Sequence, residues 1–150
     1  MSLQQWAADG WLRPHKPTRK EMADFLAIVD RDMEDSQGNV SADWRFGIAY
    51  NAALKLCTVL LHASGYRPEK TLARYRTLAA LMPILGDTRK RDADYLDACR
   101  MKRNTVEYDM AGAASKADAL ELLEFVRGFR KEVLAWLHAH HPELVPQRRR

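Results

Sequence analysis

The chain has 150 residues, 47% of them hydrophobic, and a formal net charge of +4 at pH 7. This length allows one compact domain with a buried core and leaves no room for a second. We expect no membrane-spanning segment, because no apolar run of about 18 residues occurs, and no secretory signal, because no apolar stretch follows basic residues near residue 1. The mild positive charge permits an acidic partner such as RNA without requiring one.

The first part of the chain predicts two helices and no convincing strand. A short helix spans residues 2–11, and a basic connector with two prolines follows at 13–20. Thr18 and Glu21 form a capping box that opens a longer helix, which ends near Gly38. The apolar residues of this helix recur at helical spacing and form one stripe: Met22, Phe25, Leu26, Val29 and Met33.

The next predicted helix is apolar on nearly every side and should be the central element. Ser41 caps it, and Asp43 suits the positive end of its dipole. From residue 44 to residue 61 it contains small and apolar side chains all round, and Gly65 ends it. Such a helix needs cover from several neighbours.

Three more helices are predicted after this central one. The first spans about 69–81 and is stopped by a proline and a glycine. The second begins near residue 87 and continues to a break at AGAAS, residues 111–115. An S-x-x-D capping box then opens the last helix, which spans about 115–140.

These segments predict a single all-α domain over residues 1–150. We expect an antiparallel bundle of four long helices plus a short N-terminal helix. Its core covers about 18–140, and residues 141–150 form a basic, frayed tail.

The charged stretch RMKRNTVEYD, residues 100–109, is the main candidate site. No glycine or proline interrupts it, so it can be helical. On a helical wheel Arg103 shares the inward-facing sector with Leu96 and Val106, where burying its charge requires a partner. The plain interpretation of the spacing is a salt bridge with Glu107, four residues later, at the border of the core.

The same stretch resembles the motif of the HEPN family. The resemblance rests on Arg103 and Asn104, on Tyr108, and on their position after a long alanine-rich helix and a GYRP turn at 65–68; it covers about 41–137. The family comprises small all-α domains of toxin–antitoxin pairs, of antiviral ribonucleases and of accessory proteins of nucleotidyltransferases. Its motif is an arginine, a polar residue, a short spacer and a histidine. Its ribonucleases need no metal and dimerise so that two motifs face one cleft.

The histidine of that motif is replaced here by Tyr108. RNA self-cleavage needs a group that removes the 2′-hydroxyl proton, and a tyrosine, with a pKa near 10, is ionised only to about one part in a thousand at neutral pH. The resemblance therefore implies a degenerate catalytic set of Arg103, Asn104 and Tyr108. It also implies that Arg103 and Arg100 bind phosphate, since guanidinium groups do so bidentately.

Four further polar residues leave alternatives open. His62, near the end of the apolar helix, could replace the missing histidine or be a hydrogen-bonded border residue. Asn51 could point into the same cleft or be satisfied structurally. His138 and His141 have the spacing of metal ligands, but cations that close a helix C-terminus give the same pattern. We therefore predict no metal and no cofactor.

Two functions are compatible with these features. The first is a HEPN-like protein that binds RNA or nucleotide phosphate, in a toxin–antitoxin or defence context, with weak or lost ribonuclease activity. The second is a non-catalytic interaction module that docks a partner such as a nucleotidyltransferase antitoxin. We expect a homodimer, because the apolar helix needs cover and the family builds its site across a two-fold axis. Cys57 and Cys99 form no CxxC pair and predict buried thiols in a cytoplasmic protein.

Overall fold

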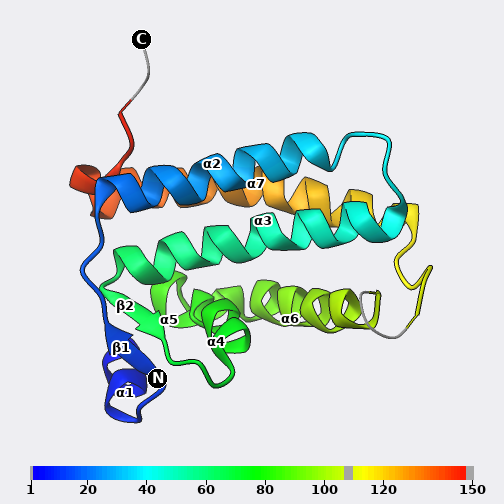
Figure 1. The fold of residues 1–150 in the computed structure, drawn as a ribbon. Coiled ribbons are helices and arrows are strands. Elements are labelled where there is room, and N and C mark those ends of the chain that lie inside the picture. Colours follow the sequence, from blue (N-terminus) through cyan, green and yellow to red (C-terminus); the bar gives the residue numbers. More distant parts are fainter. Residues whose placement is uncertain (1, 107–109, 148–150) are drawn as a thin grey trace.

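The computed structural model describes residues 2–106 and 110–147 and is built mainly of helices (Figure 1). The two strands are β1 (Leu12–Pro14) and β2 (Tyr66–Pro68), and they pair antiparallel. The helices are α1 (Leu3–Ala8), α2 (Arg19–Asp35), α3 (Ala42–Ala63), α4 (Ala73–Ala79), α5 (Leu81–Leu85), α6 (Lys90–Asn104) and α7 (Lys116–His140), with 3₁₀ turns η1 (Asp87–Arg89) and η3 (Pro142–Leu144). The all-α prediction is confirmed apart from this small sheet.

Helix α3 is the central element, as its composition predicted. It lies between α2 and α7 on one side and α4, α5 and α6 on the other (Figure 1). Ala49, Ala52 and Ala53 are fully buried, and such small side chains let neighbouring helices approach closely. The cover that α3 needs therefore comes largely from its own chain, so its apolar faces do not by themselves require a dimer.

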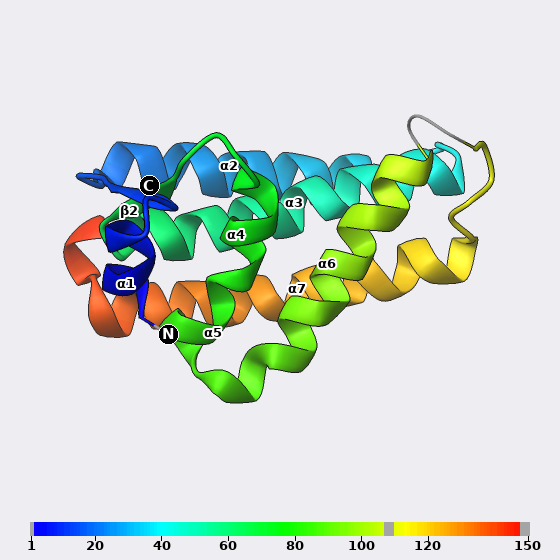
Figure 2. The same cartoon turned by 90° about the horizontal axis from the view of Figure 1, so that it is seen from below.

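Helix α6 runs obliquely across α3 and α7 (Figure 2). Leu96 and Cys99 are buried on the face that the helical wheel predicted. The ring of Tyr95 packs against Phe125 of α7, with the ring centroids 5.3 Å apart. The predicted inward stripe of α6 is thus confirmed. Arg103 belongs to this stripe and therefore lies on the side of α6 that faces the rest of the protein.

The helix starts predicted from caps are also confirmed. The side chains of Thr18, Ser41 and Ser115 each accept a hydrogen bond from a backbone N–H in the first turn of α2, α3 and α7, respectively. Only the Ser115 cap has the reciprocal bond of a capping box, from the Ser115 N–H to the Asp118 carboxylate. The Glu21 carboxylate, expected to serve the same purpose at Thr18, binds two histidines instead.

The prediction of one helix over 69–81 is wrong, and so is the prediction that no strand occurs. Leu72 adopts a left-handed conformation with φ of 54°, so α4 begins only at Ala73. A continuous helix would bring the ring of Pro83 into the carbonyl group four residues earlier, and the chain avoids this by separating α5 from α4. The strands have three residues each, too few for an alternating pattern to be recognised in the sequence.

Helix α3 also meets the length and composition criteria for a membrane span, which the sequence analysis did not expect. Its mean hydropathy reaches 1.3 over an 18-residue window. However, 61% of that window is buried inside the protein, and a buried core helix has the same composition.

We predict that truncating the centre of α3 destabilises the fold. Leu56 is fully buried there, whereas Leu120 on α7 is 57% exposed and serves as the matched control. Leu56→Ala should lower the free energy of unfolding by about 2–5 kcal/mol because it leaves a cavity. Leu120→Ala should change it by less than about 0.5 kcal/mol. Urea denaturation followed by circular dichroism measures both, and equal losses would contradict the central position of α3.

Candidate functional site

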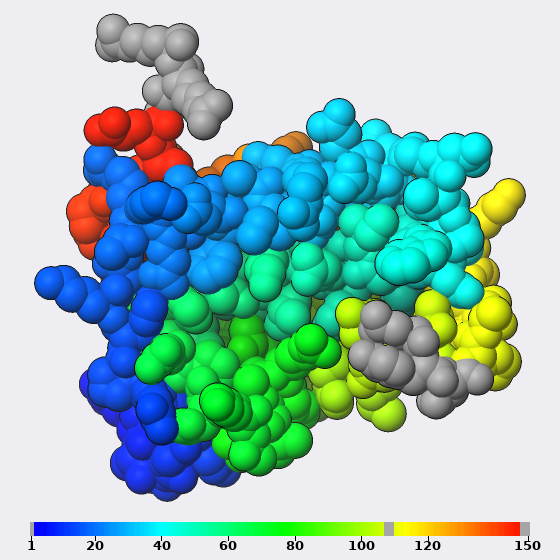
Figure 3. All heavy atoms as spheres, viewed as in Figure 1, coloured from blue at the N-terminus to red at the C-terminus, as the bar shows by residue number. Residues whose placement is uncertain are grey.

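A pocket of about 420 Å³ opens between the first half of α3, the second half of α2 and the end of α6. The start of α3 and the end of α6 lie close together on one face of the molecule (Figure 3). The pocket is lined by Asp32, Ser41, Asp43, Trp44, Gly47, Ile48, Asn51, Arg103, Val106 and Ala111.

Arg103 is the residue of the predicted motif that lines this pocket. Its side chain is half-buried on the inward face of α6, and it interacts with other groups of the protein. Asn104 is half-buried at the last residue of α6 and is not among the described residues that line the pocket. Tyr108, and Glu107 as the expected salt-bridge partner of Arg103, lie outside the described residues.

A hydrogen-bonded pair, Asp32 and Asn51, joins α2 to α3 at the pocket wall. The Asn51 amide donates to Oδ2 of Asp32 at 2.7 Å, so Asn51 is both structurally satisfied and part of the cleft. Oδ1 of Asp32 accepts from Nε and Nη2 of Arg31 at 3.2 and 3.0 Å. Asp32 is only 5% exposed, and the sequence analysis missed it. The sequence did indicate that Asp32 is buried, because this carboxylate lies on the apolar stripe of α2, three residues after Val29.

Asp43 fixes the segment that closes the other side of the pocket. Its carboxylate accepts hydrogen bonds from the backbone N–H groups of Gly112, at 2.6 Å, and Ala114, at 3.1 Å. These bonds hold the loop before α7 against the first turn of α3 and place Ala111 at the pocket. The sequence predicted Asp43 only as a partner of the helix dipole.

Trp44 gives the pocket an exposed aromatic surface. The apolar pattern of the helix predicted Trp44 to be buried, but it is 68% exposed. An exposed indole beside hydrogen-bonding groups offers a face on which a planar ligand can stack. Trp44 is therefore a candidate binding residue that the apolar pattern concealed.

Three arginines lie near a buried tyrosine of α3 that precedes the lining residue Asn51. Tyr50 of α3 is buried, and burial raises its pKa to about 12, while the charges of Arg74, Arg100 and Arg103 act in the opposite direction. All three arginines are thus close enough to act on one buried phenol. Arg100 does not line the pocket; its Nε donates to Asp97 at 2.8 Å.

His62 is not part of the pocket. It lies in the last turn of α3, about 16 Å along the helix from Asn51 at 1.5 Å per residue. In a single chain it therefore cannot exchange a proton with a group that Arg103 binds.

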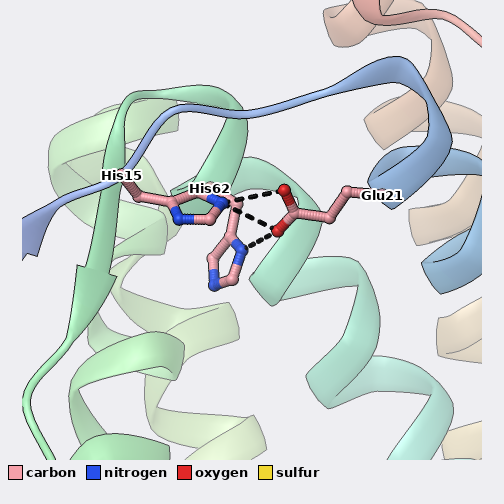
Figure 4. A group of neighbouring side chains, drawn as sticks. All are labelled: His15, Glu21 and His62. Carbon is pink, nitrogen blue, oxygen red and sulfur yellow. Dashed lines mark hydrogen bonds and ion pairs between the residues drawn. The ribbon is translucent and has the colours of Figure 1, made fainter.

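His62 instead belongs to a cluster with His15 and Glu21 (Figure 4). The Glu21 carboxylate accepts from Nε2 of His15 at 2.8–2.9 Å and from Nδ1 of His62. Burial raises the pKa of Glu21, but hydrogen bonds from the two histidines outweigh this effect and lower it below its usual value. Burial lowers the pKa of His62, which favours its neutral form. The sequence analysis named only one member of this cluster as a candidate.

The histidine pair near the C-terminus gathers no comparable set of ligands. Within the described part of the chain, His138 and His141 belong to no group of three candidate metal ligands. His138 is exposed, and His141 packs on Trp136 with ring centroids 5.2 Å apart. Its Nδ1 lies 3.6 Å from Glu143. These contacts fit a capped helix end.

The chain was also compared with known proteins. No protein-family model, no curated protein and no solved structure matches it. The function of the pocket must therefore be argued from its own residues.

Proposed function

We propose that this protein is a HEPN-like cytoplasmic domain that binds the phosphate of RNA or of a nucleotide through Arg103, with slow or absent cleavage. One observation carries the proposal: the motif arginine lines a pocket rather than an open helix face. The pocket volume of about 420 Å³ lies within the range of small-molecule sites.

The residues around Arg103 supply what a nucleotide needs. A guanidinium group binds phosphate through two parallel hydrogen bonds. Arg100 and Arg74 carry further positive charge near Tyr50, the residue before Asn51 in α3. Asn51 offers an amide for a sugar or base, and Trp44 offers a stacking surface.

The carboxylates in the pocket limit which nucleic acid fits. Asp32 and Asp43 line it together with Arg103, so the wall has mixed charge. Additional phosphates of a long RNA would meet these carboxylates and gain little. A ligand with one phosphate near the arginine suits the pocket best, either a nucleotide or the end of an RNA chain.

Cleavage should be slow because the proton-transfer group is weak. Tyr108 occupies the position of the motif histidine in the sequence. The described histidine considered as its replacement, His62, lies about 16 Å along α3 from Asn51, which lines the pocket. A missing acid–base group costs about a hundred- to ten-thousand-fold in rate.

The apolar border of the pocket favours a protein partner as the second candidate function. Trp44, Val40 and Met110 are 68%, 38% and 59% exposed, and all lie at or next to lining residues. Exposed apolar groups near one pocket are typical of an interaction surface. In this alternative the protein is a non-catalytic module that docks a nucleotidyltransferase antitoxin. The same border suits a homodimer in which two pockets face each other.

We predict that Arg103→Ala weakens binding of a fluorescent nucleoside monophosphate by at least about tenfold, since hydrogen bonds to a charged group are lost. Fluorescence anisotropy over a salt series measures it. Binding should weaken as the salt concentration rises, because added ions screen the attraction between the phosphate and the guanidinium group. Arg127→Ala, a surface arginine paired with Glu124 on α7, is the matched control and should leave binding unchanged.

Two results would contradict phosphate binding at Arg103. One is equal affinity of the wild-type protein and Arg103→Ala. The other is equal affinity for the monophosphate and for the nucleoside without phosphate. Circular dichroism of each variant checks that the helices are retained.

We predict that Tyr108→His increases ribonuclease activity. A histidine restores a group that exchanges protons near pH 7, so cleavage of a labelled RNA should rise at least about tenfold. Tyr108→Phe is the control and should not exceed the wild type. Fast cleavage by the wild type would instead mean that another residue supplies the proton chemistry.

We predict a homodimer at micromolar concentration that depends on the pocket border. Sedimentation should give twice the 17.2 kDa mass of the chain. Trp44→Asp should dissociate the dimer, because a charge in an apolar interface is costly. Leu120→Asp changes another exposed apolar side chain, on α7, and should leave the dimer intact. A wild-type monomer would rule out the shared cleft.

A further inference from the structure

Three side chains at the far end of α3 present metal-ligand atoms to one another. One atom each from His15, Glu21 and His62 lies within 4.8 Å of the other two (Figure 4). We propose that these residues bind a divalent transition-metal ion of the zinc class. The site is distinct from the Arg103 pocket and does not depend on the function proposed for that pocket.

The donor set selects the class of ion. Two imidazole nitrogens and one carboxylate oxygen suit Zn²⁺ and neighbouring first-row ions, whereas Ca²⁺ and Mg²⁺ prefer oxygen ligands throughout. Zinc binds such atoms at about 2.0–2.2 Å, so tetrahedral ligand atoms lie roughly 3.3–3.5 Å apart. His15 Nε2 is 2.8 Å from the Glu21 carboxylate. This pair of atoms therefore needs to separate by roughly 0.5–0.7 Å, and no pair in the cluster, all within 4.8 Å, needs to approach by more than about 1.5 Å, to form a coordination site.

The three ligands are held by separate, ordered parts of the backbone. His15 lies between Pro14 and Pro17, and its N–H donates to the carbonyl of Gly65 at 2.9 Å. Glu21 is in the first turn of α2, where its N–H donates to Thr18 Oγ1 at 3.1 Å. His62 is in the last turn of α3. Two of the ligands lie on helices and the third, His15, is anchored by its backbone hydrogen bond, so they lose little freedom when an ion binds.

The cluster is shielded but reachable from solvent. The side chains of His15, Glu21 and His62 are 22%, 20% and 14% exposed. The ring of Phe25 packs edge-on against the ring of His62, with the ring centroids 5.4 Å apart, and forms an apolar wall beside the cluster. An ion can therefore enter, and water can complete its coordination beside three protein ligands.

A purely structural cluster makes a different prediction. In that case the hydrogen bonds of Glu21 with the two histidines would serve only to link the segment after β1 to α2 and α3. The stability of the protein would then be independent of metal ions. An ion that binds only the folded state raises the melting temperature, so the two explanations can be separated by measurement.

Untagged protein, treated with chelator and dialysed, is titrated with Zn²⁺ by calorimetry and with Co²⁺ by absorption spectroscopy. We expect one ion per chain at roughly micromolar concentration and a higher melting temperature. Glu21→Gln, His15→Ala and His62→Ala should each weaken binding by at least about a hundredfold, the upper range seen when outer-shell partners of a metal are removed. The control variant, His138→Ala with His141→Ala, removes the histidines at the end of α7 and should bind as the wild type does.

Two outcomes overturn the proposal. The first is a wild-type protein that shows neither Zn²⁺ nor Co²⁺ binding nor a change in melting temperature. The second is binding that persists undiminished in all three cluster variants. If an alanine variant fails to fold, Glu21→Gln and the spectrum of the wild-type Co²⁺ complex decide, because imidazole and carboxylate ligands give a characteristic absorption.

Discussion

The burial of α3 is the constraint on which the rest of the structure depends. Its fully buried alanines at 49, 52 and 53 allow neighbouring helices to pack closely against it. Polar side chains on a helix covered on so many sides are stabilised when they find hydrogen-bond partners. Asn51 does so by binding Asp32, and His62 does so by binding Glu21, and each of these bonds ties α3 to α2. Each candidate site therefore contains a polar residue of the apolar helix α3: Asn51 lines the pocket, and His62 belongs to the cluster with His15 and Glu21.

The two aspartates give the pocket at the start of α3 its shape and its charge. Asp32 is buried, and such a carboxylate needs hydrogen-bond donors to offset lost hydration. Asn51 and Arg31 provide them. Asp43 holds the loop before α7 by accepting two backbone N–H groups. Because these two lining residues are anionic, the positive charge of Arg103 lies beside negative charges. This favours a ligand with one phosphate over a long polyanion.

The proposed metal site occupies the opposite end of the same helix. The long, regular α3 keeps it about 16 Å from Asn51, so the two sites can act independently. Glu21 illustrates the competition between local and tertiary interactions. A capping box would have turned its carboxylate back to its own helix, yet two histidines from other segments bind it. Either arrangement gives charge-assisted hydrogen bonds to the ionised carboxylate, and bonds from two histidines outweigh the single local bond.

The sequence by itself determined the helices whose signals are local. Caps at Ser41 and Ser115 bind backbone groups within one turn, and the period of the apolar residues placed Arg103 on the inward side of α6. Only the tertiary structure decided which distant residues meet. The pairing of 12–14 with 66–68 and the meeting of His15, Glu21 and His62 join segments far apart in the chain, and neither a cap nor a period encodes such contacts. They depend on how the packed helices and the connections between them fix the chain in space, and this is a property of the whole fold.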